Sequence, residues 1–140
     1  MPSRWRHSCW RDLIWRNILA NPMMILIAGP YRSGTGDDPE KMAANVHLME
    51  SYALPIFRLG HIPVLGEWFA LPLLHLAGSK QAGDEAYQEI FHPIAERLLK
   101  KCDAVLRIGG ASQGADLMVE VGRKNGLQIY TKLEEIPSAH

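Results

Sequence analysis

The sequence predicts a single α/β domain, in which a parallel sheet of four to five strands, ordered 2-1-3-4, carries helices on both faces. Short apolar runs alternate along the 140 residues with segments of helical spacing, which is the pattern of repeated strand–helix–strand units. Two of these runs, at 24–28 and 103–108, break into glycine-containing loops that lead into helices. Open α/β domains build their ligand pockets at such junctions.

The first strand and the first helix follow directly from local patterns. Residues 24–28 are continuously apolar, as expected of a buried parallel strand. Asp38 is a suitable helix cap, and Pro39 suits the first helical position because its missing N–H would have no partner there. Helical spacing continues to residue 57, and Pro55 is expected to kink or shorten the helix.

The second strand is expected at residues 62–65, after Gly60 ends the preceding helix. The segment 67–77 is apolar but contains Pro72, so we expect a broken helix or a covering loop. Residues 78–83 form a flexible connector.

Asp84 is expected to cap a third helical segment that reaches about residue 101 and is kinked or divided at Pro93. Its expected inward positions follow a helical spacing: Ile90, Ile94, Leu98 and Leu99.

The third strand, at 103–108, leads through a second glycine loop to a helix that Ser112 can cap. Gly126 ends this helix, and residues 127–130 form the fourth strand. Residues 133–136 are expected to add at most one terminal turn.

The composition is that of a globular protein and excludes several classes of partner. The formal net charge is zero, so no general attraction to nucleic acid or to an anionic membrane is expected. No apolar stretch approaches the roughly 20 residues that span a bilayer. Cys9 and Cys102 form neither a disulfide framework nor a zinc motif, and the histidines are too scattered for a metal site. We therefore expect a cytoplasmic protein without a metal or other cofactor.

Residues 1–22 differ from the rest of the chain and are treated as an N-terminal extension to a domain at 23–140. They hold four arginines against one aspartate, and three of the four tryptophans. The favoured interpretation is an appendage or a mis-assigned start, with Met23 or Met24 as the natural beginning. A targeting or membrane-surface segment and a partner-binding helix at 12–20 remain open.

The two glycine loops predict a ligand site. With strand order 2-1-3-4 the first and third strands are neighbours, and a crevice opens beyond their carboxyl ends. Backbone amides at a helix start favour an anion, glycine permits close approach, and arginine donates paired hydrogen bonds to phosphate or carboxylate. Neither loop contains the GK[ST] sequence of a Walker loop or the GxGxxG motif of dinucleotide-binding proteins. The expected ligand-binding residues are Gly29, Pro30, Tyr31, Arg32, Ser33, Glu67, Arg107, Gly109, Gly110, Ser112, Gly114 and Met118.

Three segments carry a resemblance to the nucleoside 2-deoxyribosyltransferase-like superfamily, and most nearly to its DUF4406 family. They are IAGPYRSG after the first strand, KKCDAVLRI before the third, and SQGADLMVEVG at the last long helix. The resemblance covers residues 24–137 and implies a flavodoxin-like, Rossmann-like sheet. It also implies a nucleoside, nucleotide or sugar-phosphate ligand, N-glycosidic cleavage or transfer in the enzymatic members, and a homo-oligomer, dimer or tetramer.

The resemblance does not supply the catalytic carboxylates. In the transferases the glutamate nucleophile lies four residues after the loop glycine, a position that Met118 occupies here. Glu120 lies two residues further, about 200° around a helix, and faces away unless the helix start is shifted. The helix aspartate of the transferases corresponds to Ala95, beside Glu96. Tyr31 occupies a position near the sugar in the superfamily.

The remaining polar residues leave alternatives open. Glu67 follows the second strand, so it could reach a ribose hydroxyl or be a turn carboxylate. Asp116 could contact a ribose or hold an arginine of the first glycine loop, or simply favour the helix start. His92 is more readily a buried, hydrogen-bonded histidine than a general base. The candidate catalytic residues are therefore Glu120, Tyr31 and Asp116, with Glu67 and Glu96 as further carboxylates.

The sequence thus predicts a nucleoside- or nucleotide-binding protein, with N-glycosidic hydrolysis or transfer as the first enzymatic hypothesis. The alternative is a non-catalytic sensor or interaction module that kept the cleft and lost the nucleophile. A third hypothesis is a phosphoribohydrolase of the lysine-decarboxylase-like type, whose glycine motif Gly109 and Gly110 only faintly resemble.

Overall fold

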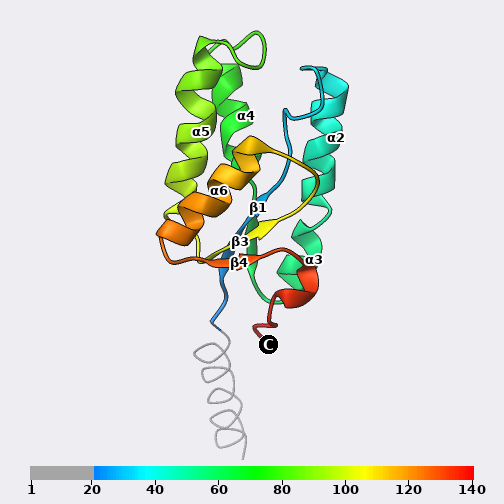
Figure 1. The fold of residues 1–140 in the computed structure, drawn as a ribbon, viewed down its shortest axis with the longest axis vertical. Coiled ribbons are helices and arrows are strands. Elements are labelled where there is room, and N and C mark those ends of the chain that lie inside the picture. The colour runs from blue at the N-terminus through cyan, green and yellow to red at the C-terminus, as the bar shows by residue number, and fades with distance from the viewer. Residues whose placement is uncertain (1–20) are drawn as a thin grey trace, which may run out of the picture.

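The protein forms one parallel four-stranded sheet in the order β2-β1-β3-β4, as predicted from the sequence (Figure 1). The computed structural model describes residues 21–140. The N-terminal extension at 1–22, apart from its last two residues, lies outside this range, and so do the interpretations given for it. The strands are β1 (Met24–Ala28), β2 (Ile62–Val64), β3 (Ala104–Arg107) and β4 (Gln128–Tyr130). In the central pair, Ala28 of β1 lies opposite Arg107 of β3, so both strands end together.

The helices cover the sheet on both faces. On one face lie α2 (Pro39–Glu50) and α3 (Ala53–Arg58), and on the other lie α5 (Glu85–Leu99) and α6 (Gln113–Lys124), with α4 (Gly66–Leu76) packed against α5 (Figure 1). Alternate residues of β1 serve the two faces. Ile25 and Ile27 join the core under α2 and α3, whereas Leu26 and Ala28 join the core under α5 and α6. The two-residue period of a strand thus builds both cores from one apolar run.

The helix caps expected from the sequence are present. Asp38 accepts a hydrogen bond from the Glu40 amide at 3.1 Å, and Pro39 is the first residue of α2. Asp84 accepts from the Tyr87 amide at 3.0 Å, and Ser112 accepts from the Ala115 amide at 3.1 Å. Each cap satisfies an amide that has no partner within its helix, and each therefore fixes where a loop beside the sheet ends.

The proline-containing segments differ partly from expectation. The helical run from Pro39 divides into α2 and α3 at Ser51 and Tyr52, four and three residues before Pro55. This is where a proline ring clashes with the preceding turn, so Pro55 is tolerated only in the first turn of a new helix. By contrast, α4 and α5 are each single helices with Pro72 and Pro93 inside them. The expected break or covering loop at Pro72 and the division into two helical pieces at Pro93 are therefore wrong.

The inward face of α5 is also rotated from the expected one. Leu99 is fully buried, as predicted, but Ile90, Ile94 and Leu98 are only partly buried, and the other buried side chain is Tyr87. The helix packs along α4 and beside α6, and only residues toward its C-terminal end join the core of the sheet. Its Tyr87 face turns toward the open space of a cavity. At the end of the chain, the short helix η1 (Leu133–Glu135) forms the single terminal turn that the sequence predicts.

Candidate functional site

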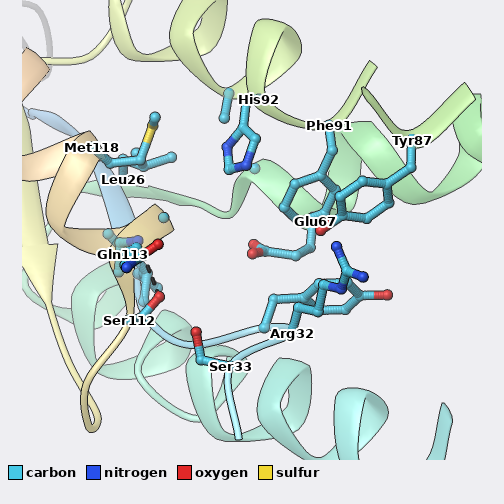
Figure 2. A pocket seen from close by; sticks show the side chains of 18 of the residues that line it. Leu26, Arg32, Ser33, Glu67, Tyr87, Phe91, His92, Ser112, Gln113 and Met118 are labelled. Atoms are coloured by element: carbon cyan, nitrogen blue, oxygen red, sulfur yellow. Dashed lines mark hydrogen bonds between the residues drawn. The ribbon is translucent and has the colours of Figure 1, made fainter. Parts of the chain in front are cut away.

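A cavity of about 250 Å³ lies beyond the carboxyl ends of the two central strands. The chain leaves β1 for α2 on one face of the sheet and leaves β3 for α6 on the other, so the cavity occupies the switch point where open α/β sheets bind ligands. Figure 2 shows side chains converging on it from the loop after β1, the start of α4, one face of α5 and the start of α6.

The cavity gathers many of the residues that the sequence predicted to bind a ligand. Those that line it are Gly29, Tyr31, Arg32, Ser33, Glu67, Ser112, Gly114 and Met118. Those that do not line it are Pro30, Arg107, Gly109 and Gly110. The predicted crevice is therefore present, but its wall on the β3 side is the start of α6 and not the preceding glycines.

Two glycines allow the loops after β1 and β3 to lie against each other. A Cβ on Gly29 would come 2.9 Å from Cδ1 of Ile108, and a Cβ on Gly109 would come 2.7 Å from Cδ of Pro30. Gly109 also has a positive φ of 78°. A side chain at Gly109 is excluded by the contact and by the backbone conformation, whereas one at Gly29 would require the Ile108 side chain to shift. Gly109 and Pro30 thus act behind the cavity by holding its two loops together.

Arg107 braces its own loop. Its guanidinium donates to the carbonyl of Gly110 at 2.8 Å, to the carbonyl of Ile108, and through Nε to the Asp116 carboxylate at 3.1 Å. The Asp116 side chain is 70% exposed and does not line the cavity. The structure thus brings these two predicted site residues to each other and not to the cavity.

An aromatic wall closes one side of the cavity. The ring of Phe91 stacks on Tyr87 with centroids 4.5 Å apart and on Tyr31 with centroids 5.1 Å apart. Burial raises the pKa of Tyr87 to about 12, and burial together with the nearby Glu67 carboxylate raises the pKa of Tyr31. Both phenols therefore stay protonated at neutral pH, which leaves the wall uncharged and able to contact a planar ligand.

Arg32 lies at the edge of this wall and is engaged by an acidic neighbour. Its Nε and Nη2 donate to the two carboxylate oxygens of Asp37 at 2.6 Å and 3.0 Å. The guanidinium also lies 5.5 Å from the centroid of the Tyr87 ring. The hydrogen bonds from Arg32 lower the pKa of Asp37, so the pair remains ionised and the arginine's charge is balanced.

Glu67 is the carboxylate that the fold places in the cavity. It lies in the first turn of α4, only 8% of it is exposed, and its side chain lines the cavity. Burial raises its pKa to about 7, while a hydrogen bond from its own backbone amide acts in the opposite direction. Figure 2 shows the carboxylate extending into the open middle of the cavity, beside Phe91 and below His92.

The other candidate carboxylates lie outside the cavity. Glu120 is exposed on α6 and reaches Lys124 at 3.7 Å, as a solvated helix residue does. Met118 is 6% exposed and lines the cavity, so the position four residues after Gly114 does face inward. Ala95 also lines it, whereas the adjacent Glu96 is exposed on the surface of α5.

Sequence reasoning missed much of the contribution of α5. Tyr87, Phe91 and Ala95 follow each other at four-residue spacing and present one continuous stripe to the cavity. This spacing is visible in the sequence, but the aliphatic stripe through Ile90 and Ile94 looked like the inward face. His92 also lines the cavity, and a Cβ on Gly114 of α6 would lie 3.4 Å from its Cε1 atom.

Comparisons with protein families, with curated proteins and with solved structures find no match to this chain. Within residues 21–140, no cluster of three or more histidine, cysteine, aspartate or glutamate side chains could hold a metal ion. None of the helices in this range has the length and apolar character needed to cross a bilayer.

Proposed function

We propose that the cavity binds a nucleoside or nucleotide, with its base against the aromatic wall. The observation that supports this most is the combination of surfaces around one space at the switch point of the sheet. Stacked rings of Tyr31, Phe91 and Tyr87 face the polar start of α6, and a buried carboxyl, Glu67, lies between them. A planar base needs aromatic contact and a few directed polar groups, and a ribose needs hydroxyl partners such as Ser33 and Gln113.

The cavity has features that a tight structural void lacks. Its polar lining includes side chains from four separate segments, among them Arg32, Glu67, His92 and Gln113. Convergence of polar groups from distant parts of the chain on one concave apolar surface is characteristic of small-molecule sites. The resemblance of these loops to the deoxyribosyltransferase-like superfamily supports the same class of ligand.

A binding module without catalysis is the second candidate function, and Met118 favours it. The transferases of the resembled superfamily need a carboxylate at this position to attack the anomeric carbon, and a thioether cannot do so. Ala95 likewise stands where they carry an aspartate. Covalent glycosyl transfer by their mechanism is therefore not proposed for this chain.

Binding is tested by thermal unfolding and calorimetric titration with a panel of nucleosides, nucleotides and sugar phosphates. A ligand at one hundred times its Kd stabilises the folded state by about 2.7 kcal/mol, which raises Tm measurably. Phe91→Ala should weaken nucleoside binding by roughly tenfold or more, since aromatic contact with a base contributes about 1–3 kcal/mol. The matched control is Phe57→Ala, which removes an exposed ring of α3 that does not line the cavity.

Two results would contradict the proposal. One is the absence of stabilisation by every member of the panel at millimolar concentration. The other is an equal loss of affinity in the Phe91 and Phe57 variants, because that would show the aromatic wall is not the binding surface.

A further inference from the structure

A buried histidine, His61, joins the two ends of the described chain. It lies between α3 and β2 and is only 3% exposed. Its Nδ1 accepts a hydrogen bond from the amide of Met23, directly before β1, at 3.0 Å. Its Nε2 lies 2.6 Å from the carbonyl oxygen of Pro137, near the end of the chain. Both contacts lie at the amino ends of the strands, away from the cavity, so the proposed ligand site does not account for this residue.

The segment that His61 binds is a C-terminal strap, residues 131–140, which ends beside α3 (Figure 1). Its anchors are few. Ile136 is buried in the core under α2 and α3, and the amide of Ala139 donates to the carbonyl of Leu59 at 2.7 Å. The hydrogen bond from His61 lies between these two anchors and ties the strap to the loop that precedes β2.

The two hydrogen bonds fix the protonation state of the His61 ring. A backbone N–H can only donate, so Nδ1 is the unprotonated nitrogen that accepts from Met23. A carbonyl oxygen can only accept, so Nε2 carries the single proton and donates it to Pro137. A second proton, on Nδ1, would face the N–H of Met23 and remove that hydrogen bond. The closed strap therefore requires the neutral ring in one tautomer.

The charged groups around His61 do not stabilise a positive ring. Arg58 at the end of α3 and His140 at the end of the strap line the same surface hollow as His61. The nearby Asp103, before β3, accepts from the first amide of β1 at 2.9 Å, and Glu135 of the strap accepts from backbone amides of its own turn. No ion pair within residues 21–140 involves His61. A second proton would thus leave an unpaired charge in a buried position.

We propose that His61 is an acid-sensitive latch that holds the C-terminal strap closed at neutral pH and releases it in acid. Protonation of Nδ1 removes the bond from Met23, and the buried charge that results is relieved when the strap lifts and water reaches the ring. A terminal segment with few anchors opens at a lower free-energy cost than the whole sheet, so the strap opens before the domain unfolds. This inference is independent of the proposed nucleoside binding.

The first test reads the ring directly in the wild-type full chain. Long-range ¹H–¹⁵N NMR spectra distinguish the two neutral tautomers of histidine from the cation. At pH 7.5 they should show a proton on Nε2 of His61 and none on Nδ1. A proton on Nδ1, in the other tautomer or in the cation, would overturn the proposal without any variant being made.

The second test measures opening of the strap by hydrogen exchange of the Ala139 amide, corrected for the intrinsic exchange rate. A solvated histidine takes up its second proton near pH 6.5, so opening should increase by up to about tenfold between pH 7.5 and pH 5.5. His61→Gln supplies an amide that can donate to the Pro137 carbonyl but does not ionise, so its opening should not depend on pH. The control His75→Gln changes an exposed histidine of α4 and should keep the wild-type dependence.

The remaining outcomes also decide the proposal. An unchanged corrected exchange rate in wild type at the two pH values would show that acid does not open the strap. An equal increase in wild type and His61→Gln would assign the opening to another group. The other histidine at this end, His140, lies 3.3 Å through Nε2 from the carbonyl of Arg58. If His140→Gln removes the pH dependence and His61→Gln does not, the latch is not His61.

Discussion

At the scale of single residues, the burial of Glu67 links function to stability. A glutamate in the unfolded chain has a pKa near 4.5, and burial raises the pKa of Glu67 in the folded protein to about 7. Below pH 4.5 the carboxyl is neutral in both states. As the pH rises toward 7 the unfolded chain loses its proton first, so the folded state loses stability progressively and reaches its full penalty above 7.

The corresponding prediction is that Glu67→Gln stabilises the protein in a pH-dependent manner. The amide keeps the shape of the side chain but does not ionise, so its advantage over wild type should grow by about 3 kcal/mol between pH 4.5 and pH 8. Urea unfolding of both proteins at several pH values measures this difference. For the control Glu89→Gln, which changes an exposed residue of α5 outside the cavity lining, the plot of unfolding free energy against pH should run parallel to that of wild type. A parallel plot for Glu67→Gln would show that the wild-type Glu67 carboxyl is solvated.

Single residues also show what the sequence alone could not supply. Glu67 was a candidate because it follows a strand, and that position is correct. Its burial depends on how α5 packs along α4, which no local pattern encodes. Arg107 was predicted to face the ligand, and Asp116 to contact a ribose, an arginine of the first loop or only the helix start. The structure pairs the two residues with each other, because an arginine near its own loop carbonyls finds partners at short range.

At the scale of elements, the junction between β3 and α6 depends on one of two adjacent glycines. Gly109 has positive φ and lies against the ring of Pro30, whereas a Cβ on Gly110 would meet no atom within 4 Å. Gly109→Ala should therefore lower the free energy of unfolding by about 1–3 kcal/mol and displace the loop that carries Tyr31. Gly110→Ala, one residue away, should change it little.

Urea unfolding measures the two glycine variants, and the fluorescence of the tyrosines and tryptophans reports displacement of the loop. Equal destabilisation by both variants would mean that general loop stiffness, and not the Gly109–Pro30 contact, holds the two loops together. A loss of nucleoside affinity confined to Gly109→Ala would extend the argument from stability to the cavity.

The ends of helices and strands could be predicted from the sequence where residues close by in the chain determine them. The caps at Asp38, Asp84 and Ser112 and the ends of β1 follow from side-chain chemistry within a few residues. The orientation of α5 could not be predicted from the sequence, because its apolar residues form two stripes and either could face inward. Tertiary packing places the aromatic stripe of Tyr87 and Phe91 at the cavity and leaves Ile90 half-buried.

At the scale of the whole molecule, the strand order brings two distant loops into one site. Alternating apolar runs and helical segments predict a parallel sheet, and the order 2-1-3-4 that we expected for it, which the structure confirms, gives the location of the cavity. The balance of charge inside it could not be predicted, since it depends on which partners the loop side chains find after folding. Arg32 is bound by Asp37, and no lysine among residues 21–140 lines the cavity.

This charge balance predicts how the protein discriminates between nucleosides and their 5′-monophosphates. A phosphate would compete with Asp37 for Arg32, so Asp37→Asn should strengthen monophosphate binding by roughly tenfold, about 1.4 kcal/mol, and leave nucleoside binding nearly unchanged. Asparagine tolerates the positive φ of 62° at this position. The control Asp38→Asn removes the same charge from the next residue, which caps α2 and does not contact Arg32. Calorimetric titration at low and high salt separates the release of Arg32 from the general loss of a negative charge. The general charge effect would appear equally in both variants and would be screened by salt.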